Sequence, residues 1–176
     1  MGNSCGDVIL LDLSDTPLLL VSFKGGGMKY KPTILLAEDD DGHAGLILRS
    51  LKDAGITNNI LCFETGEDTL DFLFKRGSGH CREDGVSYVL LLDIRLPGID
   101  GTEVLRQLKK DKWVNHIPVI MLSVSDDPED IEKCRRLGCD NYFVKPSTHE
   151  KFSNIVENLG YYIRATMLSQ MSIDFN

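Results

Sequence analysis

The sequence predicts an α/β protein built on a doubly wound parallel sheet. Five short apolar runs alternate with segments whose apolar residues recur at helical spacing. Such a strand-then-helix order is typical of parallel strands that are covered by helices on both faces. Charged or hydroxyl-bearing residues follow several of the runs. Because ligands bind beyond the carboxyl ends of the strands in this class, those residues are the first candidates for a functional site.

The expected strands are short and rich in β-branched and other apolar residues, as in a sheet whose strands are buried. They are Thr33–Ala37, Ile60–Phe63, Tyr88–Leu92, Pro118–Leu122 and Tyr142–Val144. Between and after them, apolar residues three and four positions apart predict helices. Examples are Val104, Leu105 and Leu108, then Ile131, Cys134 and Leu137, and finally Phe152, Ile155, Val156, Leu159 and Ile163.

Composition limits the functions that need to be considered. The 176 residues are 42% hydrophobic, which is enough for one domain with short extensions. The net charge of -8 argues against a surface that binds nucleic acid directly, because phosphate neutralisation requires clustered Lys and Arg. The 5 cysteines are odd in number and show no CxxC spacing, so we expect reduced structural thiols and no disulfide framework or zinc site.

Both ends of the chain are expected to lie outside the domain. Residues 1–29 are interpreted as a leader and linker, in which Gly25, Gly26 and Gly27 form a flexible stretch. Residues 166–176 are interpreted as a tail. The alternative is that the leader adds an edge strand to the sheet. Its apolar stretch, residues 8–23, is interrupted by acidic residues and a proline, so neither a signal peptide nor a membrane span is expected. A cytoplasmic location is the default expectation.

The first expected strand runs directly into four carboxylates, Glu38 to Asp41. Closely spaced carboxylates repel one another, and a hard divalent cation relieves that repulsion. Mg²⁺ takes oxygen ligands and commonly only one or two protein carboxylates, which suits a shallow crevice. The alternative is an acidic loop that begins a helix, with Asp40 or Asp41 as the N-cap. Taken alone, the run does not separate these two interpretations.

An acid also follows the third expected strand, at Asp93. Its carboxylate is placed to join the first-strand acids around one metal ion and to attack a phosphoryl donor, giving an aspartyl phosphate. Pro97-Gly98 and Asp100-Gly101 predict a turn that holds the following loop beside it. The alternative, that Asp93 caps the next helix, is weakened by its distance from Thr102.

The fourth and fifth expected strands lead to Ser123 and to Lys145. A hydroxyl and an ammonium group therefore reach the same edge as the acids. Phosphoryl transfer requires positive charge and hydrogen-bond donors around the phosphoryl oxygens, and these two side chains supply both.

Together these residues resemble the response-regulator receiver domain. The motifs are the Glu38-Asp39 pair, LLLDIRLPGIDG around Asp93, VIMLSVS around Ser123 and NYFVKP around Lys145. The resemblance implies a receiver domain at residues 30–165, a flavodoxin-like fold and strand order 2-1-3-4-5. It also implies site roles. Mg²⁺ is bound by Asp39, by Glu38 through water, by Asp93 and by the backbone carbonyl of Arg95, the phosphoryl group pairs with Lys145, and switching involves Ser123 and Tyr142.

The function implied by the resemblance is a phosphoacceptor in a two-component phosphorelay, with at most slow self-dephosphorylation. The donor is a sensor histidine kinase or a histidine phosphotransfer protein. The lengthened segment 76–87 and the stretch 109–118 are similar to stand-alone receivers of phytochrome-type kinases. Without a covalent output domain, signalling is expected through protein contacts, including a homodimer through the fourth helix, fifth strand and fifth helix.

Two other functions share parts of this pattern. A haloacid-dehalogenase-type phosphatase also uses a strand-end Asp, Mg²⁺ and a Lys, but requires an acid two residues after the nucleophile, where this chain has Arg95. Flavin binding is disfavoured because acids follow the first strand where a phosphate-binding loop is needed.

His80 and Cys81 are expected to be exposed loop residues, and His43 to begin the first helix without a catalytic role.

Overall fold

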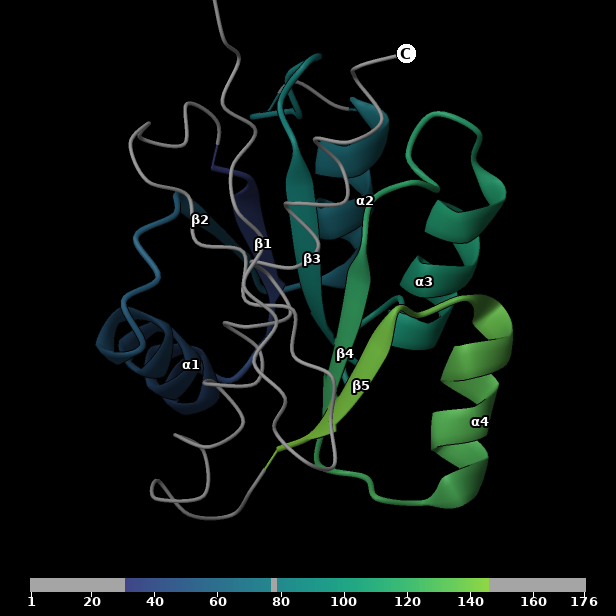
Figure 1. Cartoon of the computed structure of the whole chain (residues 1–176). Helices are drawn as coiled ribbons and strands as arrows, with labels where there is room; N and C mark the ends of the chain where they lie inside the picture. Colours follow the sequence, from purple (N-terminus) through teal and green to yellow (C-terminus); the bar gives the residue numbers. More distant parts are fainter. Residues whose placement is uncertain (1–30, 77–78, 146–176) are drawn as a thin grey trace, which may run out of the picture. The chain divides into compact units, whose positions relative to one another are not determined.

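The computed structural model describes residues 31–76 and 79–145, and these residues form a five-stranded parallel sheet in the order β2-β1-β3-β4-β5 (Figure 1). Each strand is joined to the next strand along the chain by a crossover helix, so the predicted class and strand order are confirmed. The strands are β1 (Thr33–Ala37), β2 (Ile60–Phe63), β3 (Tyr88–Asp93), β4 (Val119–Ser123) and β5 (Asn141–Val144).

Helices cover both faces of this sheet. In Figure 1, α1 lies on one side of it and the other three helices lie on the opposite side. The helices are α1 (Asp41–Asp53), α2 (Gly66–Phe74), α3 (Gly101–Lys110) and α4 (Pro128–Leu137). The helical pattern predicted from Phe152 to Ile163 falls outside the described residues, as do the predicted leader and tail.

Alternate residues of each central strand pack into two separate cores. Ile34 and Leu36 of β1 join Ile47 and Leu51 of α1 in one cluster. Leu35, on the other face of β1, packs in the second cluster with residues of α2, α3 and α4. Because successive strand side chains point to opposite faces, an uninterrupted apolar run is the pattern that buries both.

The two edge strands correct one expectation. All five runs were predicted to be buried, yet the side chains of β2 and β5 are only half-buried or exposed. Each edge strand has a neighbour on one side only, so solvent reaches it from the other. The central strands β3 and β4 are buried along their whole length.

Acidic side chains cap three of the four described helices, and the Thr65 hydroxyl caps α2. The carboxylate of Asp40 accepts a hydrogen bond from the backbone N–H of His43, and Asp100 and Asp127 cap α3 and α4 in the same manner. Such caps satisfy backbone N–H groups that have no partner within the first helical turn. Among the described residues, no helix combines the length and apolar character needed to span a membrane.

Candidate functional site

The predicted site residues meet at the carboxyl edge of the sheet because the strand registers bring them there. Ala37 lies opposite Leu92, so Glu38 and Asp93 follow on adjacent strands. Ser123 ends β4 opposite Val144, and Lys145 follows directly. These four side chains are all buried. Four separate stretches of sequence therefore contribute to one buried polar cluster at the edge of an apolar sheet.

Three carboxylates form the acidic part of this cluster. Ligand oxygens of Glu38, Asp39 and Asp93 lie within 4.8 Å of one another, and Asp39 is exposed whereas the other two are buried. The cluster therefore opens to solvent at Asp39. One buried oxygen, Oε1 of Glu38, accepts no hydrogen bond. Carboxylate oxygens at this spacing, with one unsatisfied, fit the ligand preference of Mg²⁺.

Lys145 is the cation at the centre of the cluster. Its Nζ pairs with Oε2 of Glu38 and lies 2.8 Å from Oδ2 of Asp93. Burial raises the pKa of the Glu38 carboxyl, although the hydrogen bond and charge of Lys145 oppose that shift, and the charge of Asp93 adds to it. One ammonium group faces three carboxylates, so the site has an excess of negative charge that a further cation would neutralise.

Ser123 and Tyr142, the two predicted switch residues, are linked through Ser125. The Ser123 Oγ accepts a hydrogen bond from the backbone N–H of Ser125 at 3.1 Å. The Tyr142 hydroxyl donates to the carbonyl oxygen of Ser125 at 2.9 Å. The Ser125 hydroxyl in turn donates to Asp130 in the first turn of α4 at 2.7 Å. This connection from the site to α4 rests on side-chain contacts that the sequence pattern did not indicate.

The loop after Asp93 is held by Asp100 and Glu67. Asp100 caps α3, which makes the alternative role of Asp93 as the cap wrong. Glu103 follows three residues after Asp100, and this spacing is a signal that could have identified the cap. Burial raises the pKa of Asp100, but hydrogen bonds from Thr102 and Glu103 outweigh it, so the pKa is lowered. Glu67 of α2, which the sequence analysis missed, accepts a hydrogen bond from the Ile99 N–H at 3.1 Å.

Other residues considered from the sequence lie away from this cluster. His80 and Cys81 are exposed, as expected for loop residues. Arg82 and Lys75 both pair with Asp84, and this fastens the lengthened segment before β3 to the end of α2. Arg95 is exposed in the loop after Asp93. Within the described ranges, Glu38, Asp39 and Asp93 are the residues whose ligand atoms gather closely enough to hold a metal ion.

The chain belongs to the response regulator receiver domain family, whose model matches residues 34–157. It is also 35% identical over 130 residues to the probable methanogenesis regulatory protein FilR2 of Methanothrix harundinacea. That match covers 73% of this chain and 81% of FilR2.

Solved structures place the chain near single-domain receivers. A receiver domain from Rhodospirillum rubrum superposes with a TM-score of 0.68 at 33% identity, covering 76% of this chain and 94% of that one. The phosphorylated cyanobacterial phytochrome response regulator RcpA also gives a TM-score of 0.68, at 28% identity, with 77% and 95% covered. The flavodoxin-like receiver fold and the similarity to phytochrome-associated response regulators are thereby confirmed. Receiver domains are signalling switches that take phosphoryl groups from histidine kinases and bind Mg²⁺ at an acidic cluster.

Proposed function

We propose that this chain is a phosphoacceptor of a two-component phosphorelay and that Asp93 carries the phosphoryl group. The observation that supports this most directly is the position of Asp93, whose carboxylate is buried beside Lys145 and the other two acids. A carboxylate oxygen of Asp93 attacks the phosphorus of a phosphohistidine, the P–N bond breaks, and an aspartyl phosphate forms. Attack by water on that phosphorus later restores the carboxylate, which gives slow self-dephosphorylation.

The side chains around Asp93 would bind the metal ion and the phosphoryl oxygens. Glu38, Asp39, Asp93 and the Arg95 carbonyl would hold Mg²⁺, which supplies positive charge to the phosphoryl oxygens when bound. Lys145 exchanges part of its interaction with Asp93 for the new phosphoryl oxygens. Ser123 supplies a hydroxyl donor from β4. We place the receiver domain at residues 30–165, in a chain that works inside the cytoplasm.

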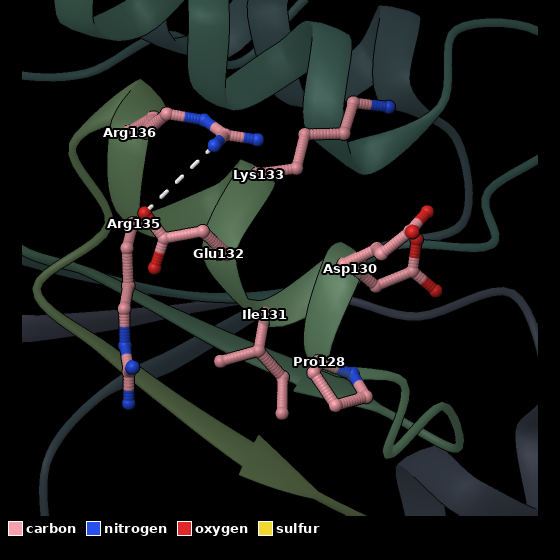
Figure 2. Close-up of a pocket in the computed structure, with 8 residues that line it drawn as sticks. Pro128, Asp130, Ile131, Glu132, Lys133, Arg135 and Arg136 are labelled. Atoms are coloured by element: carbon pink, nitrogen blue, oxygen red, sulfur yellow. Dashed lines mark ion pairs between the residues drawn. The ribbon is translucent and has the colours of Figure 1, made fainter.

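Output is proposed to pass through α4, β5 and the helix that the sequence predicts after β5. Asp130 already binds the Ser125 hydroxyl, so a shift of Ser123 toward the phosphoryl group would alter the start of α4. A pocket runs along α4 between Pro128 and Arg136, where Ile131 and Lys133 project from opposite sides of the helix (Figure 2). The surface of α4 combines apolar and charged side chains, which suits a partner protein or a second copy of the chain.

The donor is proposed to be a sensor histidine kinase, of phytochrome type, or a histidine phosphotransfer protein. Support comes from the similarity to RcpA, a phytochrome response regulator. The phosphatase alternative is not favoured, because exposed Arg95 occupies the place where that family needs an acid.

Incubation with Mg²⁺ and acetyl phosphate tests the proposal. We expect the intact mass of the chain to rise by one phosphoryl group, because acetyl phosphate offers the same electrophilic phosphorus without a partner protein. The same mixture with excess EDTA is expected to show no gain, since the acid cluster would keep its surplus negative charge. A chain whose mass stays constant with Mg²⁺ present would overturn the proposed function.

The Tyr142→Ala variant tests the switch separately from the chemistry. Tyr142 bonds to Ser125 from the edge strand β5 and is neither an acid nor the lysine of the site, so its removal should leave the phosphoryl gain unchanged. We expect a weaker phosphorylation-dependent change in association, measured as dimer fraction by light scattering with and without acetyl phosphate. Tyr142→Phe removes only the hydroxyl and isolates the contribution of the bond to Ser125. Loss of phosphorylation in either variant would contradict this division of roles.

A further inference from the structure

One atom of the acid cluster has a partner that the family motifs do not include. The side chain of Glu38 is 1% exposed, and its Oε1 accepts no hydrogen bond, whereas Oε2 pairs with Lys145. The Nδ1 atom of His43 lies 3.3 Å from that Oε1. A buried carboxylate oxygen without a donor is costly, and this imidazole is within reach of it.

The first turn of α1 holds His43 in this place. Asp40 accepts a hydrogen bond from the backbone N–H of His43 at 2.8 Å, which fixes the start of the helix. Ile47 and Leu51 follow at four-residue spacing and are fully buried against the sheet. Residues four apart share one face of a helix, so His43 lies on the face of α1 that packs against the sheet, one turn nearer the acid cluster. The side chain of His43 is 45% exposed.

We propose that His43 is a positioning residue for Glu38 and thereby sets the affinity of the site for divalent cations, an inference that rests on the proposed function. A carboxylate offers about four lone-pair directions, two on each oxygen. Lys145 pairs with one oxygen and the Nδ1 atom of His43 lies 3.3 Å from the other, so the carboxylate sits between two nitrogen groups. A lone pair on each oxygen stays free to accept from a metal-bound water.

Direct coordination by His43 fits the geometry less well. The ligand atoms that lie within 4.8 Å of one another in the described residues belong to Glu38, Asp39 and Asp93, without His43. A ring nitrogen in the ligand set would favour Zn²⁺ over Mg²⁺, whereas a donor to Glu38 leaves an all-oxygen site. The two roles therefore predict different selectivity.

Titration calorimetry of the full chain with Mg²⁺ and, separately, Zn²⁺ tests the assignment. We expect His43→Ala and His43→Phe to weaken Mg²⁺ binding about 10-fold, as for other residues that orient metal ligands. Asn places an N–H donor near the position of Nδ1, so His43→Asn should recover Mg²⁺ affinity to within about 2-fold of wild type. His116→Ala, which alters an exposed histidine in the segment between α3 and β4, is the matched control and should bind as wild type.

Each contrary result has a separate meaning. Unchanged Mg²⁺ affinity in His43→Ala, or an Asn variant as weak as Ala, would overturn the role of His43 while leaving the proposed function intact. Loss of Zn²⁺ binding alone would also overturn it, in favour of direct ligation. A wild-type chain that binds no Mg²⁺ would instead overturn the proposed function itself. Thermal unfolding in EDTA verifies the fold of each variant. If His43→Ala does not fold, the Mg²⁺ affinities of His43→Phe and His43→Asn are compared instead.

Discussion

Replacing Asp93 by asparagine is expected to abolish the gain of a phosphoryl group from acetyl phosphate. The amide has nearly the same volume as the carboxyl group but lacks the anionic oxygen that attacks phosphorus. Lys145 keeps its pairing with Glu38, so the buried ammonium is not left alone. Removing one of three clustered negative charges also relieves repulsion. The variant should therefore fold while showing no mass gain.

Asp53→Asn provides the matched control for this experiment. It makes the same chemical change at a side chain that is 67% exposed at the end of α1, and its mass gain should equal that of wild type. Near-ultraviolet circular dichroism of both variants verifies that tertiary packing is kept. A mass gain that persists in Asp93→Asn would move the acceptor to a neighbouring acid, Asp39 first, and would contradict our assignment.

Gly101→Ala is expected to be the most destabilising single-methyl change in the described part of the chain. A Cβ built on Gly101 would lie 1.9 Å from the carbonyl oxygen of Asp93, and backbone cannot swing aside as a flexible side chain can. The Gly101 N–H also donates to the Ile94 carbonyl at 2.8 Å, which holds α3 against the end of β3. Overpacking of a well-packed core costs about 1 to 3 kcal/mol, and contact with the backbone places the cost of this substitution at or above the upper value.

Urea unfolding measures the loss, and Gly45→Ala in α1 is the matched control. A Cβ on Gly45 meets nothing within 4 Å, so alanine there should stabilise the helix by about 1 kcal/mol relative to glycine. The same substitution should therefore lower the free energy of unfolding at Gly101 and raise it at Gly45. We also expect Gly101→Ala to gain the phosphoryl group more slowly, because the added methyl group displaces the backbone of Asp93. Equal stability of the two variants would show that α3 does not approach Asp93 this closely.

Much of the fold followed from local pattern. The bounds of β1 and β2 agree with those predicted, while β3 and β4 each end one residue later, at Asp93 and Ser123. Uninterrupted apolar runs predicted the strands, which are covered on both faces, and apolar residues three and four positions apart predicted the helices. The apolar pattern alone did not show that β2 and β5 lie at the edges of the sheet, and only the family resemblance implied that order.

The acids, the lysine and the serine were predictable because parallel strands carry their last residues to one edge, whatever the order of the strands. Only the tertiary structure decided which atoms meet. The structure pairs Lys145 with both Glu38 and Asp93, places the free oxygen of Glu38 beside His43, and links Ser123 through Ser125 to α4. These contacts join residues 2 to 107 positions apart. Such contacts are set by helix packing and strand register, which no local spacing encodes.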